Sequence, residues 1–93
     1  MASGNLIFLL GQVRGFVEGD FQQGEEPLAV VVVRTAPSQE GGHHWVLVPA
    51  ATAARLRETW EASDGPVEVW VLGEVRQETA RTLVRAVRLD RVS

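Results

Sequence analysis

The sequence predicts a small antiparallel β-barrel of five strands with one helix. Three stretches are apolar on both faces of a strand: Leu6–Leu10, Leu28–Val33 and Val67–Leu72. Successive side chains of a strand point to opposite faces, so such a run cannot bury all of its members in one core. A parallel sheet would need several crossover helices, and this chain of 93 residues has one helical segment. We therefore expect a barrel whose outer surface is partly covered by a partner, a second copy or a ligand with flat apolar faces.

Five segments have the composition of strands, and segments containing proline or glycine separate them. The expected strands are residues 5–14, 27–35, 43–48, 67–76 and 81–89. Gly11 lies inside the first of them, where a barrel strand bends or bulges. Residues 15–26 are glycine-rich and acidic, and we expect a loop or loose hairpin there, with further turns at 36–42 and 77–79.

Residues 50–62 are the one segment with helical periodicity. Ala53, Leu56 and Trp60 recur at spacings of three and four and form a narrow apolar stripe. Asp64-Gly65-Pro66 follows as a stop signal. Three strands, one helix and two strands is the order of the oligonucleotide-binding (OB) fold, a partly open Greek-key barrel. In that fold the helix closes the bottom of the barrel, so we expect the stripe to be the plug.

Composition narrows the class of protein. The chain contains no cysteine, so disulfides and thiolate metal sites are excluded, and nothing points to an oxidising compartment. The apolar run near the N-terminus has no basic residue ahead of it and is too short to span a membrane. We expect a single-domain cytoplasmic protein over residues 1–93.

The charges are unevenly distributed. The formal net charge is −3, and every basic side chain other than histidine is an arginine. The net acidity argues against a uniformly basic nucleic-acid binder, because phosphate contacts dominate non-specific affinity. Acidic residues gather in 18–26, whereas arginines gather in 76–91. A surface polarised in this way can still bind a polyanion on one side.

Several motifs follow one another along nearly the whole chain. They are the segments 5–13, 24–29, Trp45, 64–66, 69–75 and 83–89. The first is an apolar strand closed by glycine, a polar residue and an apolar residue, and the second is glycine, two residues, proline and a small apolar start of a strand. In order and spacing these motifs resemble bacterial single-stranded DNA-binding proteins and their shorter relative, primosomal replication protein N.

The resemblance implies that the chain binds single-stranded DNA by base stacking and arginine–phosphate contacts. It also implies a homodimer or tetramer in which the first strand pairs between subunits.

Three features of the sequence depart from the family. The segment 15–26 is acidic where the family tends to be basic, 77–80 replaces a long basic and aromatic hairpin, and no long tail with an acidic tip follows Leu89. We expect any recruitment of replication or repair proteins to use the globular surface.

Candidates for nucleic-acid binding are aromatic side chains, which stack on bases, and arginines, which contact phosphates. The resemblance places Trp45 at a base-stacking position, and packing in the barrel or at its rim is the alternative. Arg14 and Arg34 lie at the ends of the first two strands, near the binding face that the resemblance implies. For each arginine a solvated side chain is the alternative. The candidate set is Arg14, Arg34, Trp45, Arg76, Arg81, Arg85 and Phe16.

Outward apolar positions are candidates for an oligomer interface. In the fourth strand Val67, Val69 and Val71 have the parity of the barrel interior, which leaves Trp70 and Leu72 outside. Glutamates flank this pair and disfavour phosphate, so we expect Trp70 to contact protein ahead of stacking on a base. In the first strand, one of two alternating apolar sets must also face outward. The candidate interface is Leu6, Ile7, Phe8, Leu9, Trp70 and Leu72.

Catalysis has little support in the sequence. His43 and His44 are adjacent in a strand and point to opposite faces, so they cannot chelate one metal together. The sequence has no nucleophile-elbow, Walker or dinucleotide fingerprint. We expect no enzyme activity, cofactor or metal. Two functions remain open: a single-stranded DNA-binding protein, and an OB-fold interaction module that assembles as an oligomer and binds no nucleic acid.

Overall fold

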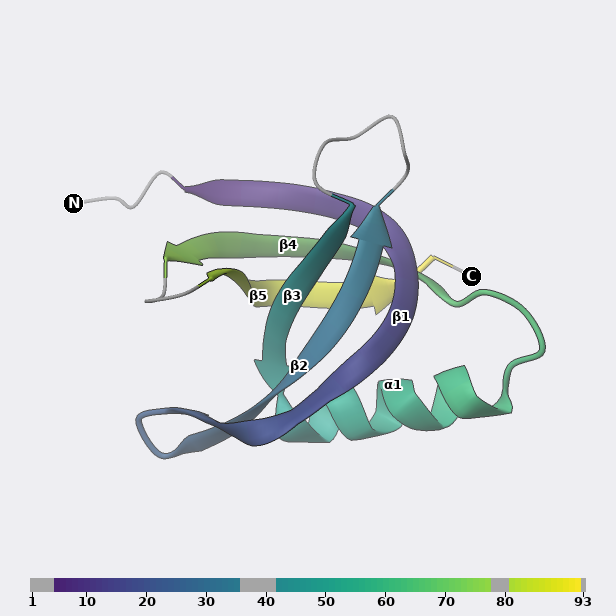
Figure 1. The fold of residues 1–93 in the computed structure, drawn as a ribbon, viewed down its shortest axis with the longest axis horizontal. Coiled ribbons are helices and arrows are strands. Elements are labelled where there is room, and N and C mark those ends of the chain that lie inside the picture. The colour runs from purple at the N-terminus through teal and green to yellow at the C-terminus, as the bar shows by residue number, and fades with distance from the viewer. Residues whose placement is uncertain (1–4, 36–41, 78–80, 93) are drawn as a thin grey trace.

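The computed structural model describes residues 5–35, 42–77 and 81–92, which form five strands and one helix (Figure 1). These elements are β1 (Leu6–Gln23), β2 (Glu26–Thr35), β3 (His43–Pro49), α1 (Ala50–Ala62), β4 (Glu68–Gln77) and β5 (Thr82–Arg91). The strands close into a barrel in the order β1-β2-β3-β5-β4, and all neighbours are antiparallel except the parallel pair β3 and β5. This confirms the predicted fold class, a five-stranded barrel with its helix between the third and fourth strands, consistent with the OB fold.

The first strand is longer than the sequence analysis predicts. Of the loop or loose hairpin expected over 15–26, the structure has the hairpin, but with long regular strands: β1 continues as a strand to Gln23 and returns into β2 through a tight turn. Gly24 in that turn has a φ of 64°, which glycine adopts without the steric cost of a side chain. Apolar residues within the segment find partners across the pair, as where Phe21 lies opposite Leu28. Two register shifts in β1 accommodate the glycine-rich sequence as irregularities of the strand.

The other predicted boundaries agree with the structure to within one or two residues. The helix spans the predicted residues 50–62. The turns expected at 36–42 and 77–79 fall largely outside the described residues.

The barrel interior is filled mainly by valines from every strand. Ala53 and Leu56 of α1 are buried against this core, and Trp60 packs on it while remaining partly exposed. The helix lies across one end of the barrel in Figure 1. The predicted apolar stripe is therefore the plug, and Val69 and Val71 of β4 face inward as predicted.

A second buried cluster lies on the outward face of β2, β3 and β5. Its buried members are Leu28, Val30, Leu47 and Leu83, with Val17, Phe21 and Trp45 packed against them. The two β2 residues alternate along the strand with those that fill the interior, so they point away from the barrel axis. Glu26 at the start of β2 lies 3.9 Å from Arg85 of β5, which shows that the β1–β2 hairpin curls over this face. The part of the outer face of β2 that carries Leu28 and Val30 is thus covered by the chain's own hairpin, where we expected a partner, a second copy or a ligand, whereas Val32 and Arg34 further along β2 are not buried.

Candidate nucleic-acid interface

Trp45 lies on an outward face that extends across three strands. It is opposite Val32 of β2 and opposite Leu83 of β5, and Leu83 is in turn opposite Arg76 of β4. Directly paired residues of neighbouring strands point to the same face of a sheet. The register therefore brings Trp45 and Arg76 to one face, although 30 positions of the sequence separate them.

Arg81 covers the indole of Trp45. The guanidinium carbon lies 3.9 Å from the ring centroid, well inside the ~6 Å range of cation–π contacts. Trp45 is half-buried, whereas Arg81 is exposed. The aromatic surface that the sequence offers for base stacking is therefore already occupied by a cation of the same chain.

Two further arginines border this face. Arg34 is two residues along β2 from Val32 and shares its parity, and it is exposed. Arg14 is also exposed and lies at the register shift between Val13 and Gly15 in β1. No carboxylate in the described part of the chain forms an ion pair with either of them or with the arginines around Trp45. The face therefore carries several arginines without an ion pair among the described residues, although the whole chain has a net charge of −3 and Glu74, opposite Arg85, lies on the same face of β4.

Arg85 lies at the margin of this face and is partly neutralised. It is opposite Leu47 of β3, and its guanidinium is 3.9 Å from the carboxylate of Glu26. The Arg85 Nε atom is buried and has no hydrogen-bond partner among the described residues. Of the predicted arginines, Arg85 is the one that forms an ion pair among the described residues.

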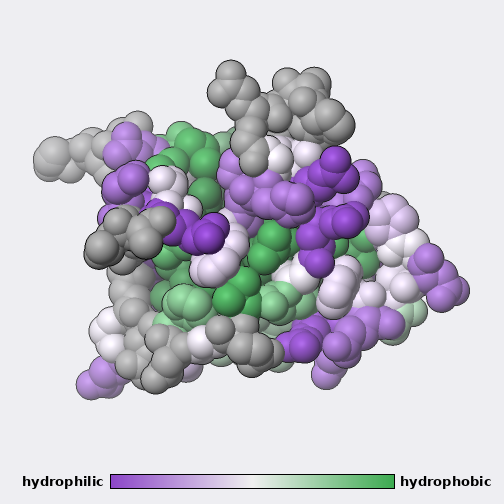
Figure 2. All heavy atoms as spheres, viewed as in Figure 1, coloured by the Kyte–Doolittle hydropathy of each residue, from purple (hydrophilic) through white to green (hydrophobic). Residues whose placement is uncertain are grey.

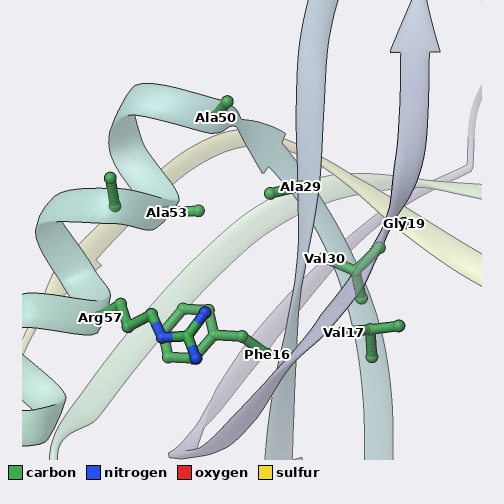
Figure 3. Close-up of a pocket in the computed structure, with 9 residues that line it drawn as sticks. Phe16, Val17, Gly19, Ala29, Val30, Ala50, Ala53 and Arg57 are labelled. Atoms are coloured by element: carbon green, nitrogen blue, oxygen red, sulfur yellow. The ribbon is translucent and has the colours of Figure 1, made fainter.

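Phe16 lies apart from the other candidate residues. It is opposite Val31, whose side chain is in the barrel interior, and its ring meets Trp60 edge to face at a centroid separation of 5.5 Å. The guanidinium of Arg57 lies 5.6 Å from the Phe16 centroid, and Figure 3 shows the two side chains lying together. The structure thus places Phe16 under the helix and away from the face that carries Trp45.

Phe16 and Arg57 also line a cavity of about 230 Å³ between α1 and the strands β1 and β2 (Figure 3). Most of its other lining residues are alanine, valine or glycine. Arg57 forms an ion pair with Glu61 at 3.3 Å. The cavity therefore offers an apolar hollow beside a cation that is already paired.

A separate apolar surface, here called the β1–β4 patch, consists of Leu6, Phe8, Leu10, Trp70 and Leu72. Phe8 is 60% exposed, and its ring stacks on Trp70 at a centroid distance of 5.9 Å. Of the predicted interface residues, Leu9 is buried in the core and Ile7 packs against it, so these two point inward. Figure 2 shows hydrophobic atoms near the start of β1 as well as over the middle of the barrel.

The two histidines differ in environment. His43 is exposed and lies opposite Arg34, whereas His44 lies opposite the buried Val33 and is half-buried. Burial, and to a smaller extent the neighbouring His43, lowers the pKa of His44 below its ordinary value of 6.5. The residues that the structure describes contain no cluster of three or more side chains able to hold a metal ion.

Comparisons with protein-family models, with curated proteins and with solved structures find no match for this chain. None of the helical residues described by the structure forms a segment long and apolar enough to cross a membrane.

Proposed function

We propose that this chain is a single-stranded DNA-binding protein of the OB-fold type, related to the bacterial single-stranded DNA-binding proteins and primosomal replication protein N. The strand lies across the outward face of β2, β3, β5 and β4. The observation that carries the proposal is the register, which gathers Arg34, Arg76 and Arg81 around Trp45 on one face. A cationic groove that follows a phosphate backbone is how such barrels hold single strands.

The overall charge restricts binding to this face. A net charge of −3 repels nucleic acid from the rest of the surface, so affinity depends on a small number of contacts and on low salt. A flexible single strand can follow a curved barrel face more closely than a stiff duplex can. Duplex DNA is therefore a poor competitor.

Fluorescence anisotropy with a labelled deoxythymidine strand tests the proposal. A strand of about 30 nucleotides exceeds the ~4–16 nucleotides that one OB barrel covers. Three phosphate contacts imply a slope near −2 in a plot of log affinity against log salt, from about −0.7 for each phosphate on a single strand. Arg34→Gln flattens the slope by about 0.7. Arg55→Gln, on the exposed surface of α1, is the matched control and leaves the slope unchanged. Absence of any anisotropy change at low salt rejects the proposal.

We further propose that two copies of the chain pair through β1. Within the described residues, positions 6–10 of β1 are hydrogen-bonded only to β4, because pairing with β2 begins at Gly11. The free edge contains no charge and no proline, and an apolar edge of this kind readily pairs with another chain. Two identical edges are self-complementary around a two-fold axis, and the β1–β4 patch would extend the contact.

The interaction-module function is the second candidate, and the Phe8–Trp70 stack, in which Phe8 is largely exposed, favours it. Exposed aromatic side chains of this size are typical anchors of protein interfaces. A chain that self-associates and gives no anisotropy change with any strand supports this function. A chain that self-associates and binds with the expected slope supports DNA binding.

A further inference from the structure

We infer that the Arg81 guanidinium binds the phosphate backbone of the strand, that Trp45 positions it, and that the indole does not stack on a base. The inference deepens the proposed function and rests on it. It assigns the chemical group that the Trp45 site recognises, a phosphodiester, and gives the tryptophan a positioning role.

The distance between the two side chains is the first argument. With its carbon 3.9 Å from the indole centroid, the guanidinium fills the layer that a stacked base would occupy. A base reaches this face of the ring only if Arg81 leaves it and the cation–π contact is lost. Trp45 also packs against the second buried cluster, which includes Leu83, so part of its surface is already buried within the fold. Stacking on Trp45 therefore carries a cost, and binding to Arg81 in place does not.

The geometry of a guanidinium held on an aromatic ring is the second argument. Its N–H donors lie in the plane of the group, so they point outward from the edges of the stacked arginine. Paired donors of this kind match two oxygens of one phosphate. Arg76 lies on the same face, because it is opposite Leu83. Arg34 lies two residues along β2 from Val32 and has the same parity. These two arginines offer further cations for neighbouring phosphates.

The distribution of aromatic residues is the third argument. Barrels that bind by stacking use several flat side chains along the strand. Phe21 is partly buried in the second cluster and Phe16 packs against Trp60, while Phe8 and Trp70 lie in the β1–β4 patch. Among the described residues the face of Trp45 therefore has one further aromatic side chain, Phe21, which is half-buried like Trp45 itself, and so short a series suits a backbone better than a run of stacked bases.

Two strands of equal length distinguish the contact modes in the unmodified protein. One is the labelled deoxythymidine strand, and the other is a fully abasic strand with the same phosphate spacing. We expect the dissociation constants to differ by less than about fivefold. Stacking of a single base is worth ~1–3 kcal/mol, which is a factor of at least about five. If the affinity for the abasic strand is about fivefold or more below that for the deoxythymidine strand, the inference is overturned but the proposed function is not. Failure of both strands to bind at low salt overturns both.

A double-mutant cycle tests the role of Trp45. Arg81→Gln weakens binding and flattens the salt slope by about 0.7, the value for one phosphate contact. Trp45→Leu weakens binding in the wild-type background, and Trp45→Phe retains affinity because it keeps an aromatic face under the cation. In the Arg81→Gln background, Trp45→Leu has less than half of its wild-type effect on the logarithm of affinity, since it acts through Arg81.

Two results of this cycle overturn the inference. One is an effect of Trp45→Leu that stays at half or more in the Arg81→Gln background, because the indole then contacts the strand itself. The other is a Trp45→Leu variant that binds as the wild type does. If Trp45→Leu fails to fold in a thermal melt, the abasic strand alone decides, because that comparison uses no variant.

Discussion

Phe8 and Trp70 stack on the outside of the barrel, with ring centroids 5.9 Å apart and an interplanar angle of 26°. They are diagonal neighbours on paired strands, because Phe8 lies opposite Leu72 and Leu10 lies opposite Trp70. Trp70 is half-buried, and the guanidinium of Arg88 lies 5.8 Å from its ring, whereas Phe8 remains largely exposed. The stack thus presents one aromatic face for burial against another surface, beside the free edge of β1.

If two copies pair through β1 as proposed, Phe8→Glu is expected to give folded monomers. A carboxylate at the centre of the β1–β4 patch opposes desolvation of the interface, and at a 60% exposed position it leaves the core intact. Sedimentation velocity measures the state, and Arg55→Glu on the helix surface is the control that stays oligomeric.

The adjacent substitution Leu9→Glu serves as the contrast. Leu9 is 7% exposed, so its replacement places a charge in the core and unfolds the barrel. A wild-type chain that sediments as a monomer at every concentration contradicts the self-association proposal.

Gly11→Ala is predicted to destabilise the barrel by ~1–3 kcal/mol, the range for forced backbone shifts. A Cβ atom at Gly11 would lie 2.3 Å from the carbonyl oxygen of Arg34, so the β1 and β2 backbones would have to separate. Gly15→Ala is the matched control, because a Cβ atom there meets nothing within 4 Å. Its free energy of unfolding is expected to stay within about 0.5 kcal/mol of the wild type. Equal urea midpoints for the two variants would show that close approach at Gly11 is not limiting.

Acidification is predicted to lower stability through His44. Burial lowers its pKa in the folded state below 6.5, so the unfolded chain binds more protons between that lowered pKa and about 6.5. The free energy of unfolding therefore rises with pH through this window. The contribution of His44 to stability is fully present above about pH 6.5 and is lost as the pH falls through the lowered pKa.

Urea unfolding at pH 5.5 and at pH 7.5 measures this effect. His44→Gln reduces the difference between the two pH values, whereas His43→Gln keeps most of it, because burial is the larger cause of the shift. One proton limits the slope to about 1.4 kcal/mol per pH unit. An unchanged pH dependence in His44→Gln would assign the effect to other groups.

Local patterns in the sequence are sufficient to predict most of this fold. Alternation in 67–72 placed Val69 and Val71 inside and Trp70 outside, and the spacing of Leu56 and Trp60 located the plug. Both patterns depend only on the periodicity of one element. The strand nature of 15–26 was missed because its glycines and acids lower the local strand propensity, and pairing with an apolar β2 outweighs that propensity.

The candidate site depends on contacts that no local pattern contains. The Arg81–Trp45 contact requires the parallel register of β3 against β5, and a shift by one residue would move the arginine to the other face. Alternation does place Arg81, which directly precedes β5, on one face with Leu83 and Arg85, and the sequence alone contains this pattern. It did not reveal that Glu26 reaches Arg85, because the curl of the hairpin is a tertiary feature.

Phe16 is expected to contribute to the stability of the barrel and not to DNA binding. Its ring meets Trp60 at 5.5 Å and lies under Arg57, so Phe16→Ala loosens α1 from the barrel. We expect a loss of ~2–3 kcal/mol, below the upper range for aromatic truncation because the side chain is only partly buried. Phe16→Leu keeps most of the apolar volume, so its free energy of unfolding falls by less than that of Phe16→Ala. Thermal melts and the near-ultraviolet circular dichroism of Trp60 measure the change.

The affinity of the folded variants for the deoxythymidine strand stays within about threefold of the wild type, since this ring faces the helix and base stacking would be worth ~1–3 kcal/mol. A folded Phe16→Ala chain that binds more than about fivefold more weakly would return Phe16 to the nucleic-acid interface.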